Sequence, residues 1–188
     1  MNNGLWENIN NTLRPKVREQ AGRNADPTAA IVDSQSVKAV DQAVSKGYDG
    51  GKKVKGRKRH FMVDVLGLLI VTCVTAASLG DRKGAHILFD KSKPVLPNLI
   101  KVWADGGYCG PLESLVSKAY GWILEIIKPV RKGPGFHVRP WCWRVERTFG
   151  WLNKNRRLSK DYEVLEATSE GVIYVCMVRL MVRRLASS

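Results

Sequence analysis

Acidic residues are scarce in this sequence, and several common features are missing. Its 188 residues contain 17 Asp and Glu against 31 Lys and Arg, which gives a formal net charge of +14. The four cysteines are far apart and form no C-x-x-C pair. We therefore expect neither a zinc site nor a disulfide framework, but the reduced thiols of an intracellular protein. The excess of basic residues favours a polyanionic partner, nucleic acid above all.

The sequence also lacks a long hydrophobic run. The least polar stretch, residues 65–80, carries no charge, but it is short for a membrane span and contains glycine, threonine and serine. A buried hairpin explains it better. Residues 1–11 are polar, so we expect no secretory signal peptide. No membrane partner is therefore expected.

The order of the predicted elements gives an α/β fold. Residues 1–27 predict a short helix and a linker, with Leu5, Ile9 and Leu13 at helical spacing, and residues 28–188 predict one domain. The elements expected in this domain are, in chain order, strands 29–32, 60–65 and 68–75, helix 82–91, strand 99–104, helix 111–119, strand 122–129, helix 141–157, and helix 169–185 with Ser169 as its N-cap. Three early strands followed by alternating helices and strands predict a mixed sheet covered by helices.

Two aspartates are each expected at the end of an apolar strand. Asp33 follows residues 29–32, Asp105 follows residues 99–104, and small or polar residues come after both. If the two strands are neighbours in the sheet, both carboxylates emerge at the same edge. An aspartate at a strand end is also a common turn residue, so the spacing alone leaves both interpretations open.

A late basic helix carries a single carboxylate, Glu146. Rotation of about 100° per residue places Val145, Phe149 and Leu152 together as the core face of this helix. Glu146 then lies at the rim of that face, beside the small Gly150. A carboxylate at the rim can reach over the edge of the sheet.

Three carboxylates that meet at one point repel each other unless a cation lies between them. Mg²⁺ and Mn²⁺ prefer such oxygen ligands. Two such ions can activate a water or a 3′-hydroxyl and stabilise the leaving oxygen of a phosphodiester. Asp33, Asp105 and Glu146 are therefore the candidate catalytic and metal-binding residues.

Other titratable residues fit this chemistry less well. Asp64 lies within a predicted strand, Asp81 is the expected cap of a helix, and Asp41 lies in a loop. None of the three is followed by the small residues found after the two candidate aspartates. No histidine has a paired nucleophile, which leaves a structural or exposed role for each of His60, His86 and His137.

Basic residues gather in two stretches that suit contact with DNA phosphates. The first follows a glycine-rich loop and has predicted strands on both sides; its alternative explanation is a flexible, solvated loop. The second stretch surrounds Glu146. The candidate DNA-binding residues are Lys52, Lys53, Lys55, Arg57, Lys58, Arg59, Arg147, Lys154, Arg156, Arg157 and Lys160.

Four segments resemble the DDE transposases of bacterial insertion sequences, in the group of insertion sequence five. They read IVDSQSVK, GYDGGKKVKGRKRHFMVD, VWADGGYCG and VERTFGWLNKNRRLSKDYE, and the likeness covers nearly the whole chain from about Leu5. The resemblance implies an RNase H-like catalytic domain over residues 28–188, with Asp33, Asp105 and Glu146 as its triad.

The same resemblance implies partners, cofactors and a location. The implied cofactor is Mg²⁺ or Mn²⁺, as two ions. The implied partner is double-stranded DNA, both the terminal inverted repeats of the element and the target. We also expect a homodimer when the protein is assembled on DNA, and a place in the bacterial cytoplasm at the nucleoid.

Two features depart from the family pattern. Little sequence precedes Asp33, where family members often carry a DNA-binding region, so the chain resembles a downstream reading frame or a truncated copy. Before the glutamate the family usually reads LPRRWVVERTF, whereas this chain reads VRPWCWRVERTF, with Trp141 and Cys142 in place of arginines and Arg144 in place of valine. The arginine replaced by Cys142 would lie one helical turn before Glu146 and hold a phosphate. Arg144 lies about 160° round the helix from Glu146 and is a poor replacement.

Three functions therefore stay open at the level of sequence. The first is a transposase that hydrolyses phosphodiesters at element ends and joins the 3′-hydroxyl to target DNA. The second is a truncated or decayed transposase that acts only as a DNA-binding protein, which Cys142 and the short N-terminal region favour. The third is an RNase H-like nuclease without strand transfer.

Restoring the replaced arginine tests the departure. We expect Cys142→Arg to strengthen DNA binding and Mn²⁺-dependent cleavage several-fold, because it returns a cation to a position one turn before Glu146. Binding and cleavage of a labelled duplex that carries the element ends measure the effect. If neither changes, position 142 has no role in phosphate contact.

Overall fold

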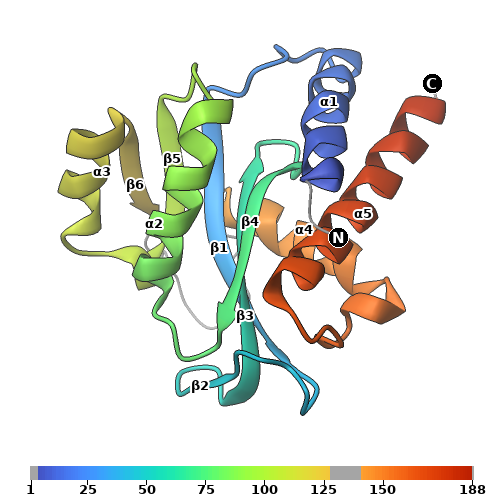
Figure 1. Cartoon of the computed structure of the whole chain (residues 1–188). Helices are drawn as coiled ribbons and strands as arrows, with labels where there is room; N and C mark the ends of the chain where they lie inside the picture. The colour runs from blue at the N-terminus through green and yellow to red at the C-terminus, as the bar shows by residue number, and fades with distance from the viewer. Residues whose placement is uncertain (1–3, 128–140, 188) are drawn as a thin grey trace, which may run out of the picture.

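The sheet at the centre of the molecule has six strands and is mixed. The computed structural model describes residues 4–127 and 141–187. The strands are β1 (Ala29–Lys38), β2 (Gly47–Asp49), β3 (Val54–Asp64), β4 (Leu69–Ala76), β5 (Lys101–Asp105) and β6 (Ile123–Ile127). The spatial order is β2-β3-β1-β5-β6, and β4 also pairs with β3 (Figure 1). The first strands pair antiparallel, whereas β1, β5 and β6 run parallel.

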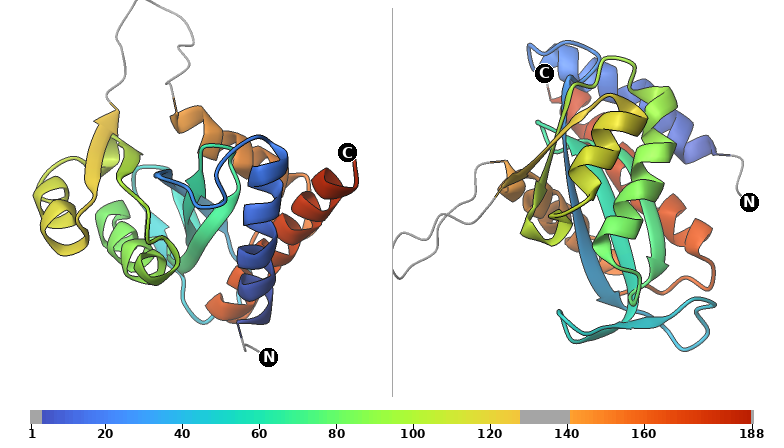
Figure 2. Two further views of the ribbon diagram at one scale, coloured as in Figure 1. Left: turned by 90° about the horizontal axis from the view of Figure 1, so that it is seen from above. Right: turned by 90° about the vertical axis from the view of Figure 1, so that its left-hand side faces the viewer.

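Helices cover both faces of the sheet. They are α1 (Leu5–Gln20), α2 (Asp81–Ser92), α3 (Leu112–Tyr120), α4 (Cys142–Asn153) and α5 (Glu166–Ala186), with short 3₁₀ turns at Lys93–Val95, Gly106–Tyr108 and Arg156–Leu158. Figure 2 shows α2 and α3 on one side of the sheet and α1, α4 and α5 on the other. The α/β class and the mixed sheet covered by helices are as predicted. Within the described residues, no helix is long and apolar enough to cross a membrane.

Two hydrophobic clusters fill the space between the sheet and its helices. One joins the sheet to α2 and α3 through residues such as Met62 and Phe89, and the other joins it to α1, α4 and α5 through Phe61 and Met177. Met62 and Phe61 are neighbours on β3 and point to opposite faces because side chains alternate along a strand. Both faces of the central strands are thus buried, which explains their continuous apolar sequence.

The β3–β4 hairpin fixes the position of α4. Its turn contains Gly67, which has a φ of 79° and whose carbonyl accepts a hydrogen bond of 2.8 Å from the Thr148 hydroxyl. The carbonyls of Val65 and Leu66, in the same turn, accept hydrogen bonds from arginines of α4. A Cβ at position 67 would lie 2.8 Å from the Thr148 hydroxyl. The turn is therefore close-packed against the helix that carries Glu146.

Several predicted boundaries differ from the structure. The first strand continues to Lys38 because its polar half pairs with β3 over the full register from Ala30–Asp64 to Lys38–Gly56. The last helix begins at Glu166, and the side chain of Ser169 is buried and donates to Asp161, so it is not an N-cap. The loop expected over residues 132–140 lies outside the described residues.

The predicted division at residues 1–27 and 28–188 stays a prediction. Helix α1 packs on the same sheet face as α5. The Asn10 amide donates to the Leu69 carbonyl at 2.9 Å, and Arg18 forms a buried ion pair with Asp64. These contacts tie the start of the described chain to the β3–β4 hairpin.

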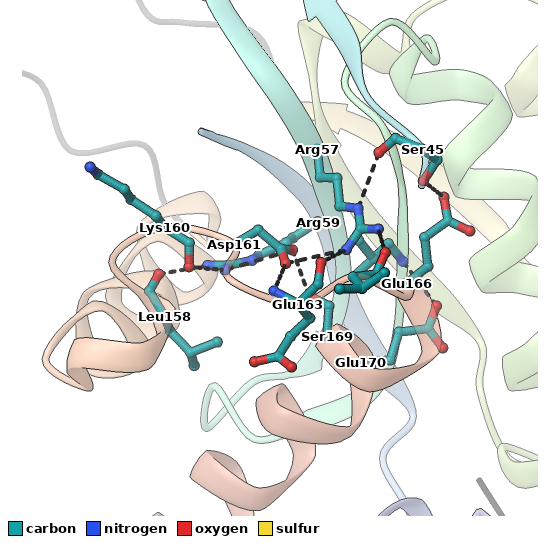
Figure 3. A network of polar contacts seen from close by, with 12 residues as sticks. Ser45, Arg57, Arg59, Leu158, Lys160, Asp161, Glu163, Glu166, Ser169 and Glu170 are labelled. Atoms are coloured by element: carbon teal, nitrogen blue, oxygen red, sulfur yellow. Dashed lines mark hydrogen bonds and ion pairs between the residues drawn. The ribbon is translucent and has the colours of Figure 1, made fainter. Parts of the chain in front are cut away.

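A buried ionic network fastens the segment before α5 to the sheet. The side chains of Arg57 and Asp161 are fully buried, with 3.3 Å between Arg57 Nη1 and Asp161 Oδ1 (Figure 3). Arg57 also donates to the carbonyls of Ser45, Glu163 and Val164 at 3.1, 2.8 and 2.6 Å. Asp161 accepts from the Ser169 hydroxyl at 2.6 Å.

Neutralising the acid in this network should destabilise the fold strongly. Asp161→Asn keeps the shape of the side chain but leaves the Arg57 charge buried without its counter-ion, so we expect a loss of about 3–5 kcal/mol in the free energy of unfolding. Urea denaturation measures it. Lys101→Gln is the control, because the Lys101–Glu125 pair is exposed and its loss should cost at most about 1 kcal/mol. Equal losses in the two variants would contradict a central role for the network.

Candidate active site

Asp33 and Asp105 lie on neighbouring parallel strands. The last paired residues of β1 and β5 are Val32 and Ala104, so the two aspartates stand one position further along the same register. The condition set by the sequence, that the two strands are neighbours, is met. Asp105 ends β5 as predicted, and its carboxylate accepts from the Gly107 amide at 2.9 Å.

Asp33 does not end its strand, which corrects the sequence prediction. It pairs with Phe61 of β3 in the middle of β1. Strand β5 stops where β1 continues, so the parallel half of the sheet ends beside Asp33 while the antiparallel half extends beyond it. At this step Asp33 is partly exposed, although it lies within a strand and not at its end.

Glu146 projects from α4 on the rim of the helix. Val145, Phe149 and Leu152 are buried against the sheet, which confirms the predicted core face, and Glu146 is exposed. Its charge is close enough to Asp33 to raise the pKa of that carboxyl. Within residues 4–127 and 141–187, however, no three His, Cys, Asp or Glu side chains lie close enough to form a metal site. The catalytic and metal-binding roles of the three carboxylates stay predictions.

The environment of Asp33 disfavours its ionised form. Burial is the largest cause, and the charges of Asp105 and Glu146 add to it, so the pKa of Asp33 rises to about 7. A hydrogen bond of 2.7 Å from the Ser34 amide and the nearby Lys52 ammonium act in the opposite direction. A divalent cation relieves this kind of repulsion, and the donors are the hard carboxylate oxygens that Mg²⁺ and Mn²⁺ prefer. The chemistry of these donors therefore suits such an ion, although within the described residues no three of them lie close enough together to hold it.

A polar network that sequence reasoning missed lies beside Asp33. Lys52 Nζ donates to the Ser34 carbonyl at 2.7 Å, and the Ser34 hydroxyl donates to Asp81 at 2.9 Å. Lys58 bridges Asp81 and Asp49 at 3.0 and 3.2 Å. Burial lowers the pKa of Lys58, but the hydrogen bonds and charges of the two carboxylates outweigh it and raise the pKa. The alternation of Ser34 and Ser36 after Asp33 is a signal in the sequence that could have pointed to this side of β1.

The competing candidates have structural positions. Asp64 is fully buried and paired with Arg18, and Asp41 is exposed in a loop. Asp81 opens α2 without a side-chain capping bond, so its predicted cap role is corrected. His60 is buried against Thr75, and burial lowers its pKa to about 4. None of these groups joins the three candidate carboxylates.

Three bases of the first predicted DNA-binding stretch are buried in β3. Arg57 and Arg59 hold the segment 158–164, and Lys58 pairs with two carboxylates. Their relative exposures are 0, 2 and 5%, so they do not present a charge to a DNA backbone. The structure therefore corrects the predicted phosphate contact for these three residues.

Arg147 is partly buried and engaged in contacts within the protein. Its guanidinium lies over the rings of Trp143 and Trp151, at 4.5 and 4.6 Å from their centroids, and it donates to the Leu66 carbonyl at 3.1 Å. Its predicted contact with DNA stays a prediction. The other candidates are exposed, and their contact with DNA stays a prediction: Lys52, Lys53, Lys55, Lys154, Arg156, Arg157 and Lys160.

Two of the residues that depart from the family pattern, Trp141 and Arg144, belong to a continuous series of cation–π contacts. We call it the Arg–Trp ladder, and its members in spatial order are Trp141, Arg144, Trp143, Arg147, Trp151 and Arg184. Arg144 also donates to the Val65 carbonyl, and Trp141 stacks on Trp103 with 4.5 Å between ring centroids. Arg144 is thus a structural residue of α4. The side chain of Cys142 lies outside what the structure describes.

Comparison with known proteins gives a family match and several similar solved structures, among them two transposase structures. The family model "Transposase DDE domain" matches residues 24–181. No curated protein matches the chain. The catalytic domain of Mos1 mariner transposase is similar at 9% identity and a TM-score of 0.47, over 98% of this chain and 91% of that chain.

The second similar structure is the piggyBac transposase in a synaptic complex with hairpin DNA. It has 10% identity and a TM-score of 0.48, over 86% of this chain and 48% of that chain. The chain therefore spans about half the length of the piggyBac protein.

The raised pKa of Asp33 predicts a pH-dependent penalty on folding. Its folded pKa of about 7 exceeds the ordinary 3.8, so the folded state binds the proton more tightly. Stability should fall as pH rises from about 4 to 7 and then level off. Asp33→Asn should therefore stabilise the metal-free protein by about 1–2 kcal/mol at pH 8, with no gain at pH 4. This is less than the full shift implies, because the side chain is partly exposed.

Urea denaturation in EDTA, at several pH values, measures this difference. Asp26→Asn is the control, since Asp26 is exposed and is not one of the charges that shift the pKa of Asp33. A gain for Asp33→Asn that does not depend on pH would rule out the electrostatic explanation.

Proposed function

We propose that this chain, which belongs to the transposase DDE domain family, is a metal-dependent DNA transposase. It hydrolyses phosphodiester bonds at the ends of a mobile element and joins the freed 3′-hydroxyl to target DNA. One observation carries the proposal: Asp33 and Asp105 follow Val32 and Ala104, the last paired residues of the neighbouring parallel strands β1 and β5, so two carboxylates from separate parts of the chain stand side by side. Burial, with smaller contributions from the charges of Asp105 and Glu146, raises the pKa of Asp33, as is typical of residues that share a cation.

Asp33, Asp105 and Glu146 would hold Mg²⁺ or Mn²⁺. The bound metal supplies Lewis-acid chemistry, which activates a water or 3′-hydroxyl and stabilises the leaving oxygen. The residues of the chain itself position the groups around Asp33. Lys52 neutralises part of the charge beside Asp33 and holds Ser34, and the Lys58 pairs with Asp81 and Asp49 keep two further carboxylates out of the site.

The partners follow from the same proposal. The exposed Lys52 and Lys53, in the loop between β2 and β3, and the exposed Lys55, at the start of β3, are the proposed contacts for DNA phosphates. We propose the terminal inverted repeats and the target DNA as substrates, a homodimer on DNA, membership of the insertion sequence five group and a bacterial cytoplasmic location. A DNA-binding protein without catalysis is the second candidate, because Cys142 removes a cation one turn before Glu146.

Cleavage of element ends tests the proposal directly. With Mn²⁺ and a labelled duplex that carries the ends, we expect nicked and joined products from the wild-type protein. We expect a loss of at least about 100-fold in Asp105→Asn, which removes a metal ligand. Asp41→Asn is the matched control, because Asp41 is an exposed loop aspartate.

The products distinguish the alternatives. Cleavage without joining would support a simple nuclease. DNA binding without cleavage above Asp105→Asn would support the decayed protein. Equal activity in wild type and Asp105→Asn would exclude this site as the catalytic one.

A further inference from the structure

A basic groove lies on the surface between α4 and α5. A hollow of about 580 Å³ is lined by the end of α4 and by α5, and its cationic side chains are Lys154, Arg179, Arg183 and Arg184. A second hollow of about 570 Å³ adjoins it through Lys154 and Arg179 and adds Arg156 and Arg157. We refer to these six cations and the two hollows as the basic groove.

No aspartate or glutamate lines either hollow. Among the described residues, Arg157 alone of the six cations has an ion-pair partner, with 2.8 Å between its Nε and Glu163 Oε1. An ordinary solvated helix face mixes both signs of charge. Six cations that converge from α4, the Arg156–Leu158 turn and α5 without a lining acid instead make a site for an anionic partner.

The wall of the groove is ordered by the Arg–Trp ladder. Arg184 lies over the ring of Trp151 at 4.6 Å, and the other cation on that ring is Arg147. Burial and, to a smaller extent, the neighbouring Arg147 charge lower the pKa of Arg184. Arg179 and Arg183 are exposed and four residues apart on α5, about 6 Å along the helix axis. A DNA strand carries a phosphate for every 3.4 Å or so of its axis, so both can meet one backbone.

The groove is separate from the candidate carboxylates. Lys154 follows Glu146 by eight residues, and this separation corresponds to about 12 Å along a helix. A duplex whose scissile phosphate lay at Glu146 would therefore reach the groove a few base pairs away. The aromatic rings beside the groove are covered by guanidinium groups, so they are not free platforms for unpaired bases.

We propose that the basic groove binds the phosphate backbone of duplex DNA that flanks the scissile position, with Arg179 and Arg183 of α5 as contacts. The proposal rests on the proposed function, since it takes DNA as the substrate. It adds a second contact surface to the three candidate carboxylates. The surface carries affinity and does not enter the chemical step.

Double neutralisation on α5 tests the proposal. In EDTA, so that no cleavage occurs, we expect Arg179→Gln/Arg183→Gln to bind a labelled duplex about 10- to 100-fold more weakly at 0.1 M salt. The slope of log K against log salt should fall by about 2, because about 0.9 counter-ions are released for each phosphate contact. Fluorescence anisotropy over a salt series measures both quantities.

The matched control is Lys83→Gln/Lys118→Gln, which removes two exposed charges from α2 and α3, on the opposite face of the sheet. It should leave most of the slope unchanged. Equal effects of the two double variants would overturn the proposal and leave only the net charge as the cause. An equal loss on single-stranded DNA of the same sequence would overturn the assignment to a duplex. Thermal unfolding of both variants should match that of the wild type, because these side chains are exposed.

The outcome is distinguishable from failure of the proposed function. In Mn²⁺ and at protein concentrations that saturate the DNA, Arg179→Gln/Arg183→Gln should cleave within about two-fold of the wild type, whereas Asp105→Asn should not cleave. A wild-type protein that shows the α5 salt dependence but never cleaves would contradict the transposase activity and support the groove. Normal cleavage by the wild type, with a salt slope that is the same in Arg179→Gln/Arg183→Gln, would support the transposase activity and contradict the groove.

Discussion

The buried contact between Arg57 and Asp161 is the interaction on which the arrangement of the other parts depends. It joins β3 to the segment between α4 and α5, and Ser169 extends it into α5. The backbone of Asp161 also bonds Lys38 and Val40 at the end of β1, at 2.8 and 3.0 Å. Asp161 therefore ties the end of β1 through its backbone and the start of α5 through its carboxylate. Because both charges are fully buried, replacing either residue alone would leave the other charge without its counter-ion.

The burial of Arg57 against Asp161 explains why the basic run at residues 52–59 serves two purposes. Arg57 and Arg59 point to one face of β3 and bind the 158–164 segment, whereas Lys58 points to the other and meets Asp49 and Asp81. The alternation follows from the period of two in a strand. Of this basic run, only Lys52, Lys53 and Lys55 keep their charges outside. Counting bases along the chain therefore overstates the surface that this stretch offers to DNA.

The sequence predicts what depends on local pattern. The β3–β4 hairpin and the core face of α4 follow from apolar residues at the period of a strand or helix, whereas the pairing of β1 with β5, which brings Asp33 beside Asp105, is only a condition at the level of sequence. The extension of β1 to Lys38 does not, because those polar residues are held by backbone bonds to β3. The burial of Arg57 does not either, because its partner lies 104 residues away. Long-range polar pairing is the part that the sequence pattern leaves undetermined.

The departures around Trp141 acquire a physical meaning in this context. Trp141 and Arg144 no longer look like lost phosphate contacts, since they form the start of the Arg–Trp ladder that stabilises α4 against the hairpin turn. The ladder ends at Arg184, in the wall of the basic groove. If that groove binds flanking DNA, the phosphate contacts are made by the far end of α4 and by α5, and not by the first turn of α4. Cys142 then costs the protein a contact near the reacting bond but not its hold on the duplex, so weakened chemistry and strong binding can coexist in one chain.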